Sequence, residues 1–278
     1  MKQVVQNMNT FLSDPAIRKM SFSWYSQKVL GRQPAQEIEG MRFTGFPSFS
    51  SFYGASKHKP GIAEVNFLRR ALPGSQFVVD AGANFGVMSA LFSQIEKEST
   101  IIALEPAPET ILSLKHNLEI NNIHNVMVEP ACLGKDVGFT DFIVGTDPAT
   151  NRMGGHEDNS IRVPTESIDN ILSKHPFDRI DFLKIDIEGA EIEALQGAAN
   201  TFQAKLIGRG IIEVCPENLA NFGNSLNELF DFFNEYNYSL YHIKLDGLEK
   251  LEASRIPKDS LLNAAFLSPE DPLHFWNS

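Results

Sequence analysis

The stretch from Ile180 to Glu191 constrains the fold most, because it joins an apolar strand to a helix through a turn rich in carboxylates. Its first half is mainly apolar and predicts a buried strand. Asp186 and Glu188 follow that strand, and Gly189 then opens a predicted helix. The apolar positions of this helix are spaced by three, four and three residues: Ile192, Leu195, Ala199 and Phe202. Acids at the carboxyl end of a core strand lie where open α/β sheets bind their ligands.

The alternation of strands and helices continues through most of the chain. Short apolar runs predict strands at residues 77–79, 101–104, 126–128, 182–187, 210–214, 239–243 and 263–267. Apolar spacing predicts helices over 87–95, around 111–118 and over 225–236, the last with Ser225 and Glu228 as a capping box. This order predicts an α/β fold with a doubly wound, mostly parallel seven-stranded sheet and helices on both faces.

Two segments lie outside this regular pattern. Residues 1–39 are predicted to be an N-terminal helical extension with a helix over 16–30, and residues 40–278 to be the main domain. Residues 40–53 are rich in aromatic side chains, which are expected to cover one edge of the core or to line a ligand mouth. β-Forming residues near turns predict an inserted hairpin that joins residues 138–144 to residues 162–163.

The composition limits the classes of function. Of the 278 residues, 42% are apolar and 21% are charged, which suits a full hydrophobic core. The net charge of −11 argues against a dominant phosphate-binding surface, so no nucleic-acid partner is expected. Without a secretory signal or a run of eighteen apolar residues, the expected location is cytoplasmic, with no membrane span. Cys132 and Cys215 lie in apolar runs and are expected to be core residues.

A glycine-containing turn follows the first predicted strand. Asp80 ends the strand, and Gly82 and Gly86 are separated by Ala83, Asn84 and Phe85. A dinucleotide-binding fingerprint has a central glycine where this chain has Asn84. Asp80 also places a negative charge where a diphosphate would lie. The turn therefore favours a cationic or amine-bearing ligand, although Asp80 taken alone could be a simple turn former.

Glu105 ends the second predicted strand, directly before Pro106. A carboxylate at this place can accept hydrogen bonds from the two hydroxyl groups of a ribose, as in other doubly wound nucleoside sites. Taken alone, it could equally be a solvated strand end. Acids at the ends of two consecutive strands favour a nucleoside with a positively charged, amine-bearing tail, and S-adenosylmethionine is such a ligand.

Five segments carry a resemblance to a known family: residues 79–86, 103–106, 130–134, 182–191 and 212–214. On these segments the chain resembles the FkbM family of S-adenosylmethionine-dependent methyltransferases, of the class I, Rossmann-like type. The resemblance covers residues 40–267, and Lys-Ile-Asp-Ile-Glu-Gly-Ala-Glu at 184–191 is its most specific part. It implies S-adenosylmethionine as the cofactor and methyl transfer to a hydroxyl of a small-molecule, saccharide, glycan or polyketide-type acceptor.

The resemblance also implies which residues bind the cofactor. Asp80, Gly82 and Asn84 would hold the methionine portion. Glu105 would bind the ribose, and Ala131 would border the adenine. The complete implied set, with the acid that this family carries upstream of its first strand, is Glu64, Asp80, Gly82, Asn84, Gly86, Glu105, Pro106, Ala131 and Asp186.

Methyl transfer to an alcohol needs a group that takes the proton, because a hydroxyl is a poor nucleophile until it begins to lose that proton. Asp186 and Glu188 lie on one side of an extended chain, and Glu213 ends the neighbouring strand. These acids could act as a base, as substrate anchors or as ligands of Mg²⁺. Lys184 and the N–H groups after Gly189 could instead neutralise them, and no metal is predicted.

The predicted catalytic residues are Asp186, Glu188 and His156. His156 lies in a polar loop, where a histidine can act as a base near neutral pH or can simply be solvated. Glu191 is expected to stabilise the start of the helix. Two other classes of function remain open. They are a non-catalytic nucleoside-binding protein of the same fold and an NAD(P)-dependent oxidoreductase, against which the missing central glycine argues.

Overall fold

The structure, a computed structural model, describes residues 20, 27, 30, 34–46, 60–145, 151–154 and 160–276. The chain divides into two compact units, Met1–Lys59 and Pro60–Ser278. In the first unit, β1 (Gln36–Ile38) pairs antiparallel with β2 (Met41–Phe43). Their connecting residues, Glu39 and Gly40, both have positive φ, as a two-residue hairpin turn requires.

This hairpin corrects part of the sequence prediction, because residues 36–38 form a strand and are not helical. The predicted helix over residues 16–30 lies almost wholly outside the described residues, as does the aromatic stretch beyond residue 46. β1 and β2 pair across the predicted domain boundary between residues 39 and 40. That boundary stays a prediction.

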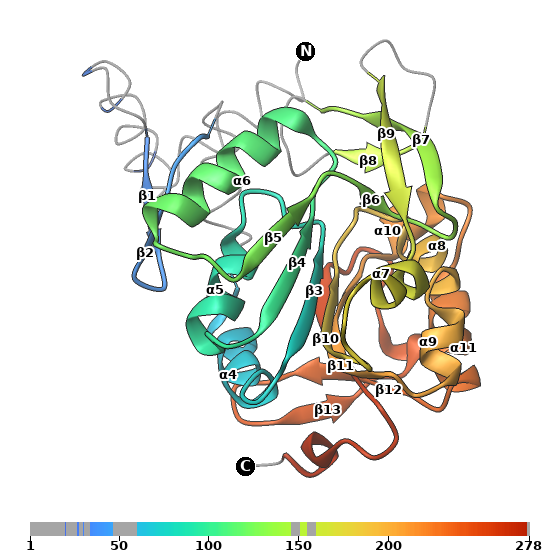
Figure 1. The fold of residues 1–278 in the computed structure, drawn as a ribbon. Helices are drawn as coiled ribbons and strands as arrows, with labels where there is room; N and C mark the ends of the chain where they lie inside the picture. Colours follow the sequence, from blue (N-terminus) through green and yellow to red (C-terminus); the bar gives the residue numbers. More distant parts are fainter. Residues whose placement is uncertain are drawn as a thin grey trace. The chain divides into compact units, whose positions relative to one another are not determined.

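The second unit is built on an eight-stranded sheet with the order β13-β12-β14-β11-β10-β3-β4-β5 (Figure 1). Its strands are β3 (Phe77–Ala81), β4 (Thr100–Leu104), β5 (Val126–Glu129), β10 (Ile180–Ile185), β11 (Ile207–Val214), β12 (Ser239–Ile243), β13 (Leu248–Lys250) and β14 (Leu262–Leu267). The strands from β11 to β5 run parallel, whereas β14 is antiparallel to both of its neighbours. Seven strands match those predicted, and the short edge strand β13 is additional.

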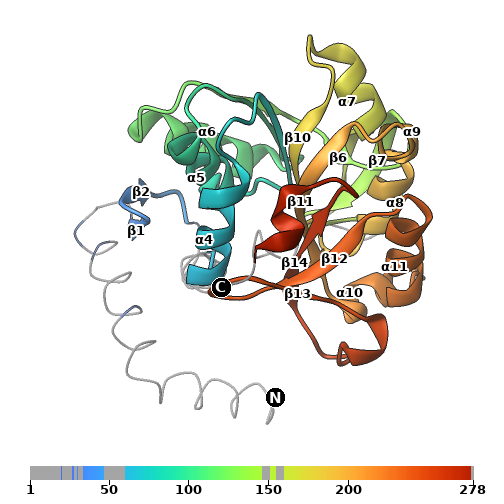
Figure 2. The same ribbon diagram turned by 90° about the horizontal axis from the view of Figure 1, so that it is seen from below.

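Helices cover both faces of this sheet, as Figures 1 and 2 show. One face carries α4 (Ile62–Ala71), α5 (Val87–Ile95) and α6 (Pro108–Ile120). The other carries α7 (Ile168–Lys174), α8 (Glu191–Gln196), α9 (Ala199–Gln203) and α11 (Leu226–Glu235), while α10 (Pro216–Asn221) follows β11. Short 3-10 helices lie at Ala253–Arg255 and Pro272–Phe275. The predicted doubly wound fold of the class I, Rossmann-like type is thus confirmed, as is the capping box of Ser225 and Glu228 at α11.

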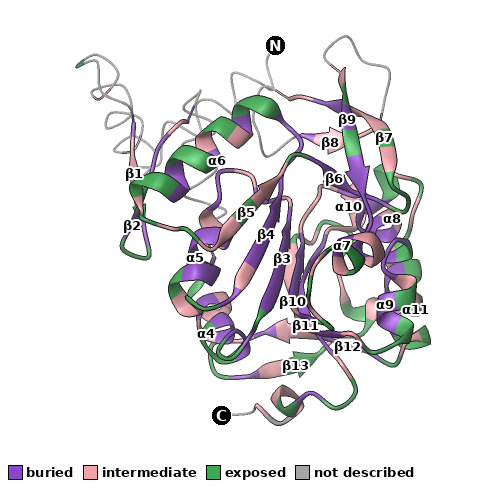
Figure 3. Cartoon of the chain, viewed as in Figure 1, coloured by how far each residue is buried: buried purple, intermediate pink, exposed green. Residues whose placement is uncertain are grey.

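The central strands are buried because helices cover them on both sides, and β3, β4 and β10 are buried along most of their length in Figure 3. Leu195 and Phe202 pack in the main core, as predicted. The predicted single helix is, however, broken into α8 and α9 after Gln196. The break occurs at Gly197, where a Cβ would lie 2.2 Å from the carbonyl oxygen of Gly134, so another backbone segment packs directly against it.

A second sheet follows β5 in the chain. It consists of β6 (Cys132–Leu133), β7 (Gly138–Ile143), β8 (Arg152–Met153) and β9 (Ser160–Glu166), in the order β6-β9-β7-β8. β7 and β9 pair antiparallel, with Asp141 opposite Arg162, which confirms the predicted inserted hairpin. Among the described residues, none of the helices combines the length and the apolar character that a bilayer crossing requires.

Candidate active site

The turn between β3 and α5 forms one side of the candidate site. The N–H of Gly82 donates to the carbonyl oxygen of Leu104 at 3.1 Å, which attaches the turn to the end of β4. Gly82, Asn84 and Gly86 all have positive φ. A Cβ on Gly82 would lie 1.8 Å from the carbonyl oxygen of Asp186. The turn therefore packs directly on the backbone that follows β10, and position 82 requires glycine for both conformation and space.

Asn84 presents a free acceptor in this turn. Its backbone N–H donates to Glu105 Oε2 at 3.0 Å. Its side-chain oxygen Oδ1 is buried and has no hydrogen-bond partner within the described part of the chain. A buried polar atom without a partner is costly. A ligand that carries an ammonium group would satisfy this oxygen, which is the chemistry expected of the methionine end of the cofactor.

Asp80, which was predicted to attract a cationic ligand, is fully buried on β3. Its Oδ2 accepts a hydrogen bond from the hydroxyl of Ser89 at 2.5 Å. Its Oδ1 lies 3.5 Å from Nζ of Lys184. The cation beside Asp80 is thus a lysine of the chain itself. Asp80 supports the turn from within the sheet, and a contact of its own with the cofactor stays a prediction.

Glu105 lies at the end of β4 and is 5% exposed. In addition to its bond from Asn84, it accepts a hydrogen bond at Oε1 from the N–H of Ala107, at 3.0 Å. Burial raises the pKa of Glu105 to about 7, although the two backbone donors act in the opposite direction. Each carboxylate oxygen can accept a further hydrogen bond, so the predicted ribose contact is compatible with this geometry.

The pKa of Glu105 predicts a pH dependence of cofactor binding. Ribose hydroxyls donate to the ionised carboxylate, so binding should strengthen as pH rises through about 7. Between pH 6 and pH 8 the affinity for S-adenosylhomocysteine, measured by calorimetry, should increase about tenfold. Glu105→Gln is the control, and its weaker binding should not change over the same range. A wild-type affinity that is flat with pH would contradict the ribose assignment.

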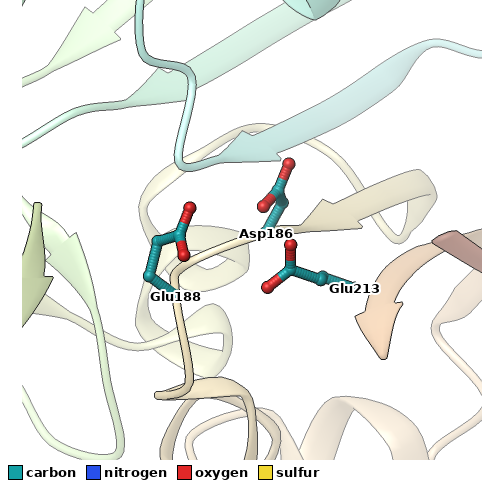
Figure 4. Close-up of side chains that lie close together, drawn as sticks. All are labelled: Asp186, Glu188 and Glu213. Atoms are coloured by element: carbon teal, nitrogen blue, oxygen red, sulfur yellow. The ribbon is translucent and has the colours of Figure 1, made fainter. Parts of the chain in front are cut away.

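A cluster of three carboxylates forms the second side of the candidate site. Asp186 and Glu188 follow β10, and Glu213 lies next to the last residue of β11. One carboxylate oxygen from each residue lies within 4.8 Å of the others, and Figure 4 shows the three side chains turned toward one another. The side chain of Asp186 is 32% exposed, whereas Glu213 is buried.

Like charges this close disfavour full ionisation. Burial, followed by the charge of Asp186, raises the pKa of Glu188 to about 8 and that of Glu213 to about 9. Nδ2 of Asn218 donates to Oε2 of Glu188 at 3.1 Å and to Oε2 of Glu213 at 3.3 Å. Near neutral pH the two glutamates therefore retain protons for most of the time. The cluster can exchange protons or, by the type and spacing of its oxygen atoms, accept a hard cation.

Glu191 closes the turn between β10 and α8. Its Oε1 accepts hydrogen bonds from the N–H groups of Ile187 and Gly189, both at 3.2 Å. Burial raises the pKa of Glu191 to about 7, while its backbone donors lower it. Glu188 and Gly189 have positive φ in the same turn. These bonds fit the role at the helix start that was expected for Glu191.

Glu64 reaches the same edge of the sheet from α4. Its Oε2 accepts a hydrogen bond from the N–H of Gly61 at 2.6 Å, and its Oε1 accepts one from Nδ2 of Asn263 at 2.6 Å. Asn263 is the register partner of Glu213 in the pair of β11 and β14. Glu64 is thus connected to the strand end that carries the acid cluster, and its contact with the cofactor stays a prediction.

Three predicted residues remain: Ala131, His156 and Pro106, which directly follows Glu105. Pro106 and Ala131 are both buried. Ala131 packs in the main core with Ala81 and Leu133, so its side chain contacts the protein interior. His156 lies outside the described residues, and its catalytic role stays a prediction.

Among the described residues, three contribute to the site although they were not among the predicted catalytic or cofactor-binding residues. Ser89 and Asn218 bond the acids as described above, and Lys184 lies 3.1 Å from Asp186, which confirms that it neutralises an acid. A lysine inside an otherwise apolar strand is the pattern that could have identified Lys184 as a site residue. Asn218 could have been suspected from its place in a helix that starts directly after a strand-end acid.

Comparison with known proteins gives relatives in sequence. "Methyltransferase 1" of Beauveria bassiana is 28% identical over 165 residues, which cover 51% of this chain and 66% of that protein. "Methyltransferase sdnD" of Sordaria araneosa is 27% identical over 161 residues, which cover 45% of this chain and 61% of that protein. The chain therefore spans slightly less than two thirds of the length of these relatives.

Solved structures give weaker likenesses. Precorrin-6y C5,15-methyltransferase from Geobacter metallireducens has a TM-score of 0.42 and 13% identity, covering 73% of this chain and 87% of that one. TYW2 of M. jannaschii in complex with AdoMet has a TM-score of 0.39 and 14% identity, covering 85% and 86%. Such scores support no argument about this chain, whose fold rests on its own strand order.

The model of the methyltransferase FkbM domain matches residues 80–240, which is more than half of the chain. The matched region begins at Asp80, includes the glycine-containing turn and the whole acid cluster, and ends in β12. These are the segments that build the candidate site. The chain belongs to the FkbM methyltransferase domain family.

Proposed function

We propose that the chain is an S-adenosylmethionine-dependent methyltransferase that methylates a hydroxyl oxygen of a small-molecule, saccharide, glycan or polyketide-type acceptor. The observation that carries this proposal is the contact between the glycine-containing turn and the acid cluster. Gly82 packs on the backbone of Asp186, and the N–H of Asp186 donates to Ala81 at 3.2 Å. A ligand held on the turn is therefore adjacent to the cluster. Membership of the FkbM family supports the same activity.

The residues on the turn fit the cofactor chemically. Asn84 Oδ1 is the buried acceptor without a partner, and Glu105 has remaining acceptor capacity beside it. When bound, S-adenosylmethionine supplies a sulfonium methyl group, whose carbon bonds to the acceptor oxygen as the carbon–sulfur bond breaks and its electron pair stays on sulfur. Asn84 would accept from the ammonium group and Glu105 from the ribose.

The acid cluster supplies the proton chemistry. Asp186 is assigned as the group that takes the hydroxyl proton, because it is partly exposed and lies beside the turn. The pKa values of Glu188 and Glu213 are raised to about 8 and about 9. While they are protonated, these side chains can donate hydrogen bonds to oxygen atoms of the acceptor molecule. A general base in this position contributes about 10²–10⁴-fold to a rate.

We propose that this chemistry proceeds without a metal, although the three oxygen ligands could accept one. Lys184 already balances Asp186, and Asn218 already donates to both glutamates.

Thermal stabilisation by S-adenosylhomocysteine, compared with NAD, tests the proposal. A ligand at a hundred times its dissociation constant should stabilise the protein by about 2.7 kcal/mol, and only S-adenosylhomocysteine should do so. Equal shifts with both ligands, or none with S-adenosylhomocysteine, would exclude it. Incubating the protein with isotope-labelled S-adenosylmethionine and candidate acceptors then separates an enzyme from a binding protein, since only an enzyme transfers the label.

A further inference from the structure

Lys184 contacts both sides of the site from inside the sheet. Its side chain is 4% exposed, and its Nζ lies 3.5 Å from Asp80 Oδ1 and 3.1 Å from Asp186 Oδ2. The same Nζ donates to the carbonyl oxygens of Ala81 and Gly82, each at 3.5 Å. One ammonium group thus contacts Asp80 on β3, the acid after β10, and the carbonyl groups of the last residue of β3 and the first residue of the turn.

The surrounding charges explain how a lysine is accommodated in this core position. Burial lowers the pKa of Lys184, but the charges of Asp186 and Asp80 outweigh burial, and the pKa is raised. Glu105 at the end of β4 and Glu188 after β10 also interact with its charge. A buried ion is strongly destabilising when its partner is removed, so Lys184 and Asp80 depend on each other.

We propose that Lys184 is a positioning residue that holds the glycine-containing turn in its cofactor-binding conformation. This inference rests on the proposed function, since it assigns the turn to S-adenosylmethionine. Lys184 donates hydrogen bonds to the carbonyl groups of Ala81 and Gly82 and forms ion pairs with Asp80 and Asp186. It therefore links the start of the turn to both acids. The positions of Asn84 and Glu105 depend on the path of this backbone, because Asn84 is two residues further along it and donates to Glu105.

A purely structural ion pair elsewhere in the same sheet provides the comparison. Nε of Arg209, on β11, lies 2.7 Å from Oδ2 of Asp271, whose side chain is 1% exposed. Arg209 also donates to the carbonyl oxygen of Ala71, at the end of α4. Arg209 pairs in register with Phe182, two residues before Lys184, so its pair lies toward the amino end of the parallel strands and away from the turn. Removing either cation costs stability, but only Lys184 contacts the turn.

The test is binding of S-adenosylhomocysteine to the full chain by calorimetry, with unfolding measured in parallel. Lys184→Met should weaken binding by about tenfold or more, whereas Arg209→Met should bind like the wild type. Lys184→Arg, which keeps the charge, should recover part of the affinity. The double variant with Asp80→Asn removes both buried charges. This double variant should bind S-adenosylhomocysteine no more weakly than the weaker-binding of the two single variants, Lys184→Met and Asp80→Asn, because the two residues act through each other.

The outcomes separate the two proposals. If the wild type does not bind S-adenosylhomocysteine, the proposed function itself fails. If the wild type binds and a folded Lys184→Met variant binds within about twofold of it, the inference about Lys184 is overturned. Equal weakening by Arg209→Met would also overturn it, because the effect would then be one of general stability. If Lys184→Met does not fold, the double variant with Asp80→Asn decides in its place, and binding by it within about twofold of the wild type overturns the inference.

Discussion

Replacing Asp186 by asparagine is expected to lower kcat by about 10²–10⁴-fold while binding of S-adenosylhomocysteine is retained. The amide has nearly the shape of the carboxylate, so the backbone contact with Gly82 should persist. It cannot take a proton from the acceptor. Glu188 and Glu213 are poor replacements near neutral pH, because burial, the largest cause of their raised pKa values, persists in the variant. Turnover with an identified acceptor at saturating S-adenosylmethionine provides the measurement.

Asp181→Asn is the matched control for this prediction. Asp181 lies near the amino end of β10, the strand that Asp186 follows. It accepts hydrogen bonds from the N–H groups of Gln76 and Phe77 and pairs with Arg179. Its replacement should lower the free energy of unfolding without a comparable change in kcat. Full turnover by Asp186→Asn would show that Asp186 is not the base. Loss of S-adenosylhomocysteine binding would instead show that Asp186 serves cofactor binding.

The gathering of Asp80, Glu105 and Asp186 was predictable because each follows an apolar run that reads as a buried strand. Carboxyl ends of parallel strands meet at one edge of a doubly wound sheet, so acids at these ends must lie near one another. The register bears this out: Asp80 is opposite Ala103, one residue before the end of β4, and opposite Lys184 on β10. The alternation of strands with helices and the apolar character of the strands were sufficient to predict this part of the site.

The partners of these acids were not predictable in the same way, because they depend on packing between distant segments. Asn218 reaches Glu188 across 30 residues, and Asn263 reaches Glu64 across 199. The break between α8 and α9 has a similar origin. It follows from the close approach of residues 134 and 135 to Gly197, which the apolar spacing of the helix does not encode.

The chemical state of the acids was also beyond the sequence. Three carboxylates near a strand end suggested a set of negative charges or metal ligands. Burial raises the pKa of Glu188 and Glu213 so far that they retain protons near neutrality. These effects depend on the depth at which each group is buried, and sequence patterns constrain that depth only coarsely.

Replacing Gly82 by alanine is expected to remove the stabilisation that S-adenosylhomocysteine gives the wild type, about 2.7 kcal/mol at a hundred times its dissociation constant. Gly82 has a φ of +76°, which costs an alanine about 1–2 kcal/mol. The added Cβ would also lie 1.8 Å from the carbonyl oxygen and 3.0 Å from the carbonyl carbon of Asp186. Because these are backbone atoms, the turn and the end of β10 must separate.

Gly74→Ala isolates the conformational part of this effect. Gly74 has a φ of +83°, but a Cβ there would meet no atom within 4 Å. Its replacement should therefore cost about 1–2 kcal/mol of unfolding free energy and leave ligand stabilisation unchanged. Gly82→Ala should cost about 1–3 kcal/mol more, because of the overlap, and lose the ligand response. If both variants respond to S-adenosylhomocysteine like the wild type, the contact between the turn and Asp186 is not required for cofactor binding.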